Sequence, residues 1–172
     1  MNKLIKMMNL LAIGGETVEI EYQYRFGLPR TIVWKYIKNE NLLKNSLQGC
    51  KSFIETSTGV YKGEIDIHLG PLHDLFNFDV QLDEEKAPVT LRLKIKGHGS
   101  LGELNGNAIL LFKDYQSGTQ ILCKAKGEVS GALGLTGKRL LDSGATKGLE
   151  NFFSNLEKEM KRTLYELKKR NR

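Results

Sequence analysis

The chain has 172 residues, 40% of them hydrophobic, which is enough for one compact domain with a buried core. Its formal net charge is +6, but residues 158–172 hold seven Lys or Arg against two Glu, and residues 1–15 hold two Lys. Because nucleic-acid-binding domains carry a basic face on the folded domain itself, this distribution argues against nucleic acid as a partner. No stretch reaches the ~20 apolar residues of a transmembrane helix, so a soluble protein is expected.

Three segments are expected. Residues 1–15 form an N-terminal extension, residues 16–157 the folded domain, and residues 158–172 the basic end of the last helix. In the extension two Lys precede a short apolar run, but a signal-peptide cleavage site is missing. Either the extension is a loosely ordered leader, or it forms a short helix with one apolar side made of Leu4, Met7, Met8 and Leu11.

Residues 17–26, TVEIEYQYRF, alternate apolar and polar side chains, which predicts a half-buried strand. Pro29 suits the first turn of a helix, and the TIVWKYI that follows has an apolar stripe at helical spacing. A second short helix is predicted over residues 39–47, with its end before Gly49.

Six further strands are predicted from alternating segments separated by turn-forming residues such as Asn-Gly and Ser-Gly. Parallel strands need crossovers of about a dozen residues, and the short links leave no room for them, so the strands form an antiparallel meander. These strands cover residues 51–55, 60–69, 74–82, 89–96, 103–112 and 119–129.

From Leu133 to the end, apolar residues recur at intervals of three and four, which predicts one long helix. The fold class is therefore α+β: a strand, two short helices, six strands and a long helix. A curved seven-stranded sheet needs an element to cover its apolar face, and this helix is the only predicted element of sufficient length.

Residues 97–102, GHGSLG, match the glycine pattern of dinucleotide-binding proteins. That pattern binds pyrophosphate only where its glycines end a strand and begin a helix. Here the next segment, ELNGNAILLF, predicts a turn and another strand. We therefore interpret the glycines as bends in curved strands rather than a nucleotide site.

In this order, the segments resemble the G-subunit family of carbon monoxide dehydrogenase, a branch of the START-like (SRPBCC) helix-grip superfamily. The resemblance covers residues 16–156, with Gln48 in place of the proline of the family's I-P-G-C motif. The residues that carry it are Val33-Trp34, LQGC at 47–50, Gly70-Pro71, GHGSLGELNGNA at 97–108, Gly118-Thr119 and LGLTGKRLLDSGATKGLENFF at 133–153.

The resemblance implies a sheet wrapped around the terminal helix, with an apolar cavity between them. Strand alternation places Ala108 and Ala125 on the inner face and Arg92, Lys94, Lys96, Lys124 and Lys126 on the outer face. The expected cavity lining consists of Tyr61, Ile65, Phe78, Leu93, Ile95, Leu110, Phe112, Ile121, Cys123, Leu141, Ala145, Gly148 and Phe152.

Three glycines, Gly137, Gly144 and Gly148, fall on nearby positions of one side of the predicted helix. A glycine inside a helix costs about 1 kcal/mol relative to alanine. Two explanations stay open. Either the helix backbone packs closely on the sheet there, or the missing side chains leave volume for a ligand.

Reactive groups are scarce in this lining. The histidines, His68, His73 and His98, fall at turns or outward positions without an evident acidic partner, and no set of metal ligands is recognisable. The two cysteines, Cys50 and Cys123, match no zinc or redox spacing and predict reduced thiols in a cytoplasmic protein.

Other charged groups on the last helix are expected to lie at the surface. Asp142 and Lys138, four residues apart, predict a surface ion pair. The basic end could be a solvated helix terminus, a contact with an anionic membrane surface, or a contact with a protein partner. Its cations are Lys158, Lys161, Arg162, Lys168, Lys169 and Arg170.

The first hypothesis is therefore a non-enzymatic carrier of an apolar small molecule, without a covalently bound cofactor or metal. The resemblance implies a partner, a molybdenum hydroxylase of the carbon monoxide dehydrogenase type, and a ligand such as a quinone at the inner face of the membrane. A cyclase or hydrolase is the second hypothesis, with Tyr61 and His98 as its one plausible pair. An assembly factor whose own side chains fill the cavity is the third.

Overall fold

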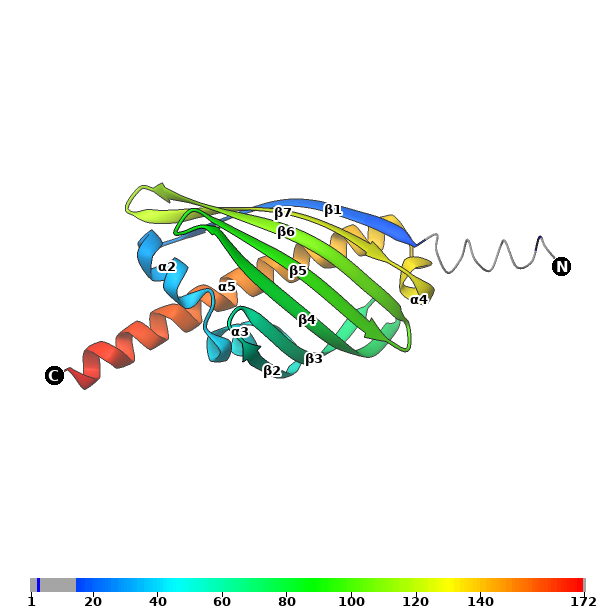
Figure 1. The fold of residues 1–172 in the computed structure, drawn as a ribbon, viewed down its shortest axis with the longest axis horizontal. Helices are drawn as coiled ribbons and strands as arrows, with labels where there is room; N and C mark the ends of the chain where they lie inside the picture. The colour runs from blue at the N-terminus through cyan, green and yellow to red at the C-terminus, as the bar shows by residue number, and fades with distance from the viewer. Residues whose placement is uncertain (1–2, 4–14, 172) are drawn as a thin grey trace.

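The computed structural model describes residue 3 and residues 15–171, and the sequence-predicted helix of Leu4, Met7, Met8 and Leu11 lies outside them. Seven antiparallel strands form one curved sheet, and a long helix runs along its concave side (Figure 1). The elements are β1 (Glu16–Phe26), α2 (Arg30–Tyr36), α3 (Glu40–Ser46), β2 (Cys50–Ser57), β3 (Val60–Leu69), β4 (Leu72–Lys86), β5 (Thr90–Gly99), β6 (Gly102–Tyr115), β7 (Gly118–Val129), α4 (Gly131–Gly134) and α5 (Lys138–Arg170).

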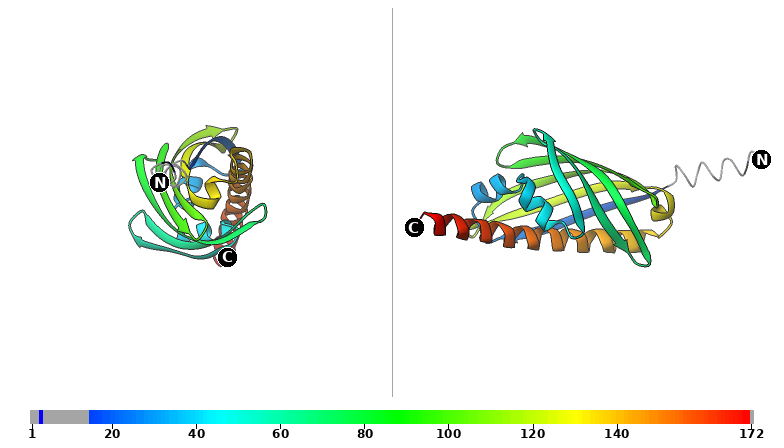
Figure 2. Two further views of the ribbon diagram at one scale, coloured as in Figure 1. Left: turned by 90° about the vertical axis from the view of Figure 1, so that its right-hand side faces the viewer. Right: turned by 90° about the horizontal axis from the view of Figure 1, so that it is seen from below.

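The strand order across the sheet is β1-β7-β6-β5-β4-β3-β2. Strands β2 to β7 pair with their neighbours in sequence, and β1 joins the far edge by pairing with β7. Viewed along the molecule, the sheet curls around α5 (Figure 2). The predicted α+β fold, with two short helices after the first strand and a long terminal helix, is confirmed.

The two short helices begin where the sequence places helix-starting residues. Pro29 precedes α2, and the Asn39 side chain caps α3 by accepting a hydrogen bond from the Leu42 amide at 3.1 Å. Helix α2 buries Val33 and Trp34, and the Trp34 ring packs edge-on against Phe112 of β6. Through these contacts α2 closes one end of the curved sheet.

The long helix differs from the prediction at its start. Instead of one helix from Leu133, the short α4 ends at Gly134 and α5 begins at Lys138. Between them Gly137 has a φ of 96°, a left-handed conformation that interrupts a helix and that favours glycine. Gly137 is therefore the residue before the start of α5. The prediction that it lies inside one long helix is wrong.

The core consists of three hydrophobic clusters. The first joins α2 to the C-terminal half of α5 and includes Phe153, Leu156 and Met160. A second lies at the other end, where Leu133 of α4 and Leu141 of α5 pack together. The third joins α3 to β2 and β3. The first and second clusters thus hold α5 against the sheet at two separate places.

A polar contact also fixes α5 to the end of β1. The Tyr24 hydroxyl donates to Glu157 Oε1 at 2.8 Å, and the Gly27 amide donates to Glu157 Oε2 at 2.6 Å. Lys161 Nζ lies 3.6 Å from the same carboxylate. Burial, together with the neighbouring Glu157, raises the pKa of Tyr24 well above its usual value, so the phenol keeps the proton that it donates.

The GHGSLG motif forms the hairpin between β5 and β6, and the chain continues as a strand rather than a helix. The Asp74 carboxylate accepts hydrogen bonds from the Ser100 hydroxyl and the Leu101 amide, both at 2.9 Å. At Gly102 a Cβ atom would lie 1.9 Å from the Ser130 carbonyl oxygen. These glycines therefore allow a tight turn and a close backbone approach.

Candidate ligand-binding site

Burial alternates along the strands that face α5. On β5, Leu93 is half-buried while its neighbours Arg92 and Lys94 are exposed. The two charged side chains are on the outer face, so Leu93 points to the concave side, where it packs against the first hydrophobic cluster.

One row of apolar residues crosses the concave face of the sheet. The row runs from β1 to β4 through paired positions, and all its members are apolar and half-buried. One member packs against the second cluster, and three pack against the first: Ile20 against the second, and Ala125, Leu93 and Leu82 against the first. Its members are Ile20, Ala125, Ala108, Leu93 and Leu82.

Small side chains concentrate on β6 and β7 at this place. Gly106 pairs with Gly127, and Ala108 pairs with Ala125, all four on the concave face. We call these four residues the small-residue block. Along the same strands, larger side chains flank the block: Leu104 and Val129 on one side, Leu110 and Cys123 on the other. The side chains of the block occupy less volume on the concave face than the larger ones that flank them, and we call the position over the block the hollow.

The predicted lining residues divide into three groups by burial. Gly148 alone is exposed. The buried group belongs to the packed clusters and consists of Tyr61, Leu110, Phe112, Ile121, Cys123 and Leu141. The half-buried group consists of Ile65, Phe78, Leu93, Ile95, Ala145 and Phe152; all but Ile95 pack against the edges of the same clusters.

The two glycines inside α5 have different surroundings. A Cβ atom on Gly144 would lie 2.6 Å from Leu69 Cδ1, so the helix packs closely on β3 there. A Cβ atom on Gly148 would have no atom within 4 Å. Close packing therefore accounts for Gly144, whereas open space lies beside Gly148.

Asp142 does not form the predicted ion pair with Lys138. Its atom Oδ1 is shielded from solvent and has no hydrogen-bond partner among the described residues. The spacing to Lys138 alone gave no sign that this acid is half-buried. The informative signal was the spacing to Ala145 and Leu149, three and seven residues further, which puts Asp142 on the apolar face of α5.

The one pair considered for catalysis is separated. Tyr61 is buried on the concave side, and its hydroxyl donates to the Lys38 carbonyl oxygen at 2.7 Å. His98 is exposed on β5, beside the half-buried Gly99 and the buried Gly97, so it is on the outer face. The sheet lies between the two side chains, and they cannot act on one substrate.

The other histidines lie at the tip of the β3–β4 hairpin. His68 and His73 are exposed and stack with ring centroids 4.3 Å apart. Contrary to expectation, His73 has an acidic neighbour, since its Nε2 lies 3.6 Å from Asp66 Oδ1. Within residue 3 and residues 15–171, no group of three or more His, Cys, Asp or Glu is arranged to hold a metal ion.

Both cysteines are free thiols. Burial raises the pKa of Cys123 to about 11, and burial also raises the pKa of the half-buried Cys50. A thiol with a raised pKa is protonated near neutral pH and is a weak nucleophile. The lining therefore gains no reactive group from Cys123.

The predicted contact cations at the basic end are all exposed: Lys158, Lys161, Arg162, Lys168, Lys169 and Arg170. Arg162 pairs with Glu159 at 2.7 Å and with Glu166 at 3.4 Å. Figure 1 shows that this end of α5 projects beyond the sheet. Among the described residues, no helix is long and apolar enough to span a bilayer.

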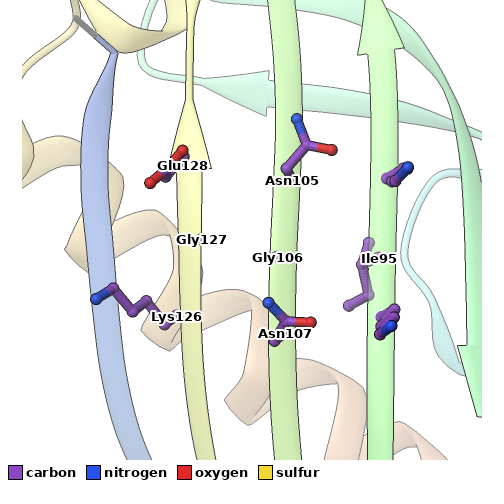
Figure 3. Close-up of a pocket in the computed structure, with 9 residues that line it drawn as sticks. Ile95, Asn105, Gly106, Asn107, Lys126, Gly127 and Glu128 are labelled. Atoms are coloured by element: carbon purple, nitrogen blue, oxygen red, sulfur yellow. The ribbon is translucent and has the colours of Figure 1, made fainter.

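Two shallow depressions lie on the outer face, of about 300 Å³ and 550 Å³. Figure 3 shows the smaller one over Gly106 and Gly127, the outer side of the small-residue block. Charged side chains surround it, and Lys126 Nζ lies 3.5 Å from Glu19 Oε1 on the neighbouring strand. The outer face is thus polar, in contrast to the apolar concave side.

A seven-stranded antiparallel sheet curved around a long C-terminal helix, with two short helices after the first strand, defines a helix-grip protein. The sequence matches the carbon monoxide dehydrogenase G-subunit family (CoxG) over residues 23–161, and the chain belongs to this family. No significant match is found among curated proteins.

Solved structures share the fold at low sequence identity. A conserved protein from Geobacillus kaustophilus has a TM-score of 0.77 and 20% identity, over 86% of this chain and 97% of that one. The protein TTHA0849 from Thermus thermophilus has a TM-score of 0.63 and 14% identity, over 86% and 99%. The ZhuI aromatase/cyclase from Streptomyces sp. R1128 has a TM-score of 0.65 and 8% identity, over 87% and 96%.

Proposed function

We propose that the chain is a non-enzymatic carrier that binds an apolar small molecule, without a covalent bond, between the sheet and α5. The observation that carries this proposal is the row of inward-facing, half-buried apolar side chains around the small-residue block. Apolar surface left accessible inside a fold is stabilised when a ligand covers it, by roughly 25 cal/mol for each Å². Ligand pockets are concave and mostly apolar for this reason.

Membership of the CoxG family supports a more specific role. We propose that the carrier works beside a molybdenum hydroxylase of the carbon monoxide dehydrogenase type and that a quinone is a suitable ligand. A lipophilic electron acceptor matches the apolar lining. The exposed cations at the end of α5 match an anionic membrane surface, which attracts basic segments by about 1 kcal/mol for each Lys or Arg. The protein would then act at the inner face of the membrane.

The two alternatives have less support. A cyclase or hydrolase is consistent with the ZhuI aromatase/cyclase neighbour, but the Tyr61 hydroxyl is already bonded to a backbone carbonyl and His98 is on the opposite face. An assembly factor with a filled cavity would bind no apolar molecule, so the binding experiment separates it from the carrier.

Direct binding tests the carrier function. The purified protein is titrated with a short-chain quinone, and the dissociation constant is measured by calorimetry. We expect Ala108→Phe, which places a ring in the hollow, to weaken binding by at least about tenfold, or about 1.4 kcal/mol. Native mass spectrometry of the protein as isolated also detects any apolar molecule that it retains.

The matched control is Ile109→Phe, which adds a ring at the next residue of β6 on the outer face. It should leave the dissociation constant unchanged within about twofold, a difference of about 0.4 kcal/mol. Thermal unfolding checks that both variants are folded. Equal loss of binding in both variants, or no binding by the wild type, contradicts the proposed site.

A further inference from the structure

Asp142 on α5 places a carboxylate on a helix face that is otherwise apolar. Residues spaced three or four apart share one face of a helix, and here every member of that face is buried or half-buried and only the first is acidic. The face consists of Asp142, Ala145, Leu149, Phe153, Leu156 and Met160. One acid therefore lies at the start of an apolar stripe that runs along the concave side of the sheet.

No group among the described residues donates a hydrogen bond to Asp142 Oδ1. Its helix neighbours Leu141 and Ala145 pack into the cluster that also contains Val18, Phe76 and Leu133. Lys138 and Arg139, on the preceding turn, are exposed, and neither forms an ion pair with Asp142. Oδ1 is thus removed from water and remains unpaired among the described residues.

A buried acceptor without a partner is unfavourable, and folded proteins contain few of them. A sequence that needed only an apolar helix face would have Leu or Ala at this position, as at positions 141 and 145. Asp142 is half-buried with Oδ1 shielded and unpartnered among the described residues, and a molecule bound beside it can supply the missing donor.

We infer that the ligand is an apolar molecule with a hydrogen-bond donor, a hydroxyl or an ammonium group, at one end, and that Asp142 accepts this donor. The inference rests on the proposed carrier function, because it assigns the polarity of a ligand in the same hollow. Among quinone-type ligands, a hydroquinone carries such a donor, whereas a quinone carries only acceptors. Asp142 then discriminates between ligands by their polar end.

Three probes with the same alkyl chain test this inference: decanol with a neutral donor, decylamine with a cationic donor, and methyl decyl ether without a donor. Their affinities are measured by displacement of a fluorescent apolar dye from the full-length protein. We expect the wild type to bind decanol or decylamine at least about fivefold more tightly than the ether, which corresponds to about one hydrogen bond.

Two substitutions identify the acceptor and the donor. Asp142→Leu should make the affinities for the three probes equal and should raise the melting temperature of the empty protein, because the unpaired oxygen is gone. Asp142→Asn keeps a hydrogen-bond acceptor but removes the negative charge. This variant should still bind decanol more tightly than the ether, but it should no longer bind decylamine more tightly than the ether. Glu150→Leu, at an exposed position on the same helix, is the control for charge and should change neither preference.

The outcomes separate the inference from the carrier function. If the wild type binds the ether as tightly as the other two probes, the carrier function stands and the inference is wrong. The inference is also wrong if Asp142→Leu keeps the preference, or if that variant is less stable than the wild type. If none of the probes displaces the dye and a quinone does not bind either, the carrier function itself is wrong.

Discussion

At the scale of single residues, the two thiols differ in accessibility. Cys123 is 2% exposed, and burial raises its pKa to about 11, whereas Cys50 is half-buried and its Sγ contacts the Ser52 carbonyl oxygen at 3.2 Å. A thiol reacts as the thiolate, and the fraction of thiolate rises as the pH approaches the pKa. Neither thiol is therefore a strong nucleophile at neutral pH.

We expect a disulfide reagent at pH 8 to label Cys50 slowly and Cys123 only after unfolding. Mass spectrometry of peptides from protein labelled with and without denaturant measures both rates. Raising the pH towards 11 should accelerate the labelling of Cys123 in the folded state only slightly, because access also limits the reaction. Rapid labelling of Cys123 in the folded protein at pH 8 would contradict its buried position.

The sequence predicted correctly on which face a side chain lies where the residue follows a repeating pattern. The prediction failed for Asp142, which departs from the apolar pattern of its helix face. Alternation correctly assigned Leu93 to the inner face and Lys94 to the outer face, because strand period fixes the face of every side chain. Asp142 was assigned to a surface pair because a carboxylate four residues from a lysine is normally solvated. Its spacing to Ala145 and Leu149 was the better guide, because it puts Asp142 on the apolar face of α5.

At the scale of elements, α5 carries two glycines with different consequences. Replacement of Gly by Ala inside a helix raises the free energy of unfolding by about 0.5–1 kcal/mol where there is space for the methyl group. We expect Gly148→Ala to gain this amount, since its Cβ would contact nothing. Gly144→Ala should gain less or lose stability, because Leu69 has to move away from the new methyl group.

Urea denaturation of the two variants and the wild type measures these differences in the free energy of unfolding. The pair is internally controlled, since both substitutions add one methyl group to the same helix. Equal gains in the two variants would show that the Leu69 side chain moves aside without loss of stability. A loss in Gly148→Ala would show that the space beside it is occupied in solution.

Among the elements, the strands were the most predictable and the start of the last helix the least. All seven strands were located; β3 has the predicted bounds, and most of the others extend further, for example to Lys86 in β4. The break between α4 and α5 was missed, because TGKRLL continues an apolar helical pattern across it. Only the left-handed backbone at Gly137 reveals the interruption.

At the scale of the molecule, the basic end and the core share one helix. Met160 is fully buried, although it lies beyond Lys158, where the basic end was expected to begin. Truncation at that point would remove core packing together with charge, so it cannot test the role of the cations alone. Substitution of exposed cations avoids the problem.

We expect Lys168→Gln, Lys169→Gln and Arg170→Gln together to weaken binding to anionic vesicles by about 1 kcal/mol for each cation removed. Flotation with phosphatidylglycerol and with phosphatidylcholine vesicles measures the effect, and salt should diminish it. A matched control removes the same charge from the outer face through Lys94→Gln, Lys96→Gln and Lys124→Gln. If both triple variants lose binding equally, net charge rather than the helix end attracts the vesicles.

The pairing of β1 with β7 has a consequence for synthesis of the protein. The first strand leaves the ribosome early, yet its partner follows six strands later, as the pairing of Glu16 with Val129 shows. Contacts between segments so distant in sequence form slowly. Until β7 and α5 are made, the apolar side of β1, with Val18 and Phe26, has no cover, so nascent chains of this protein need protection from aggregation for most of translation.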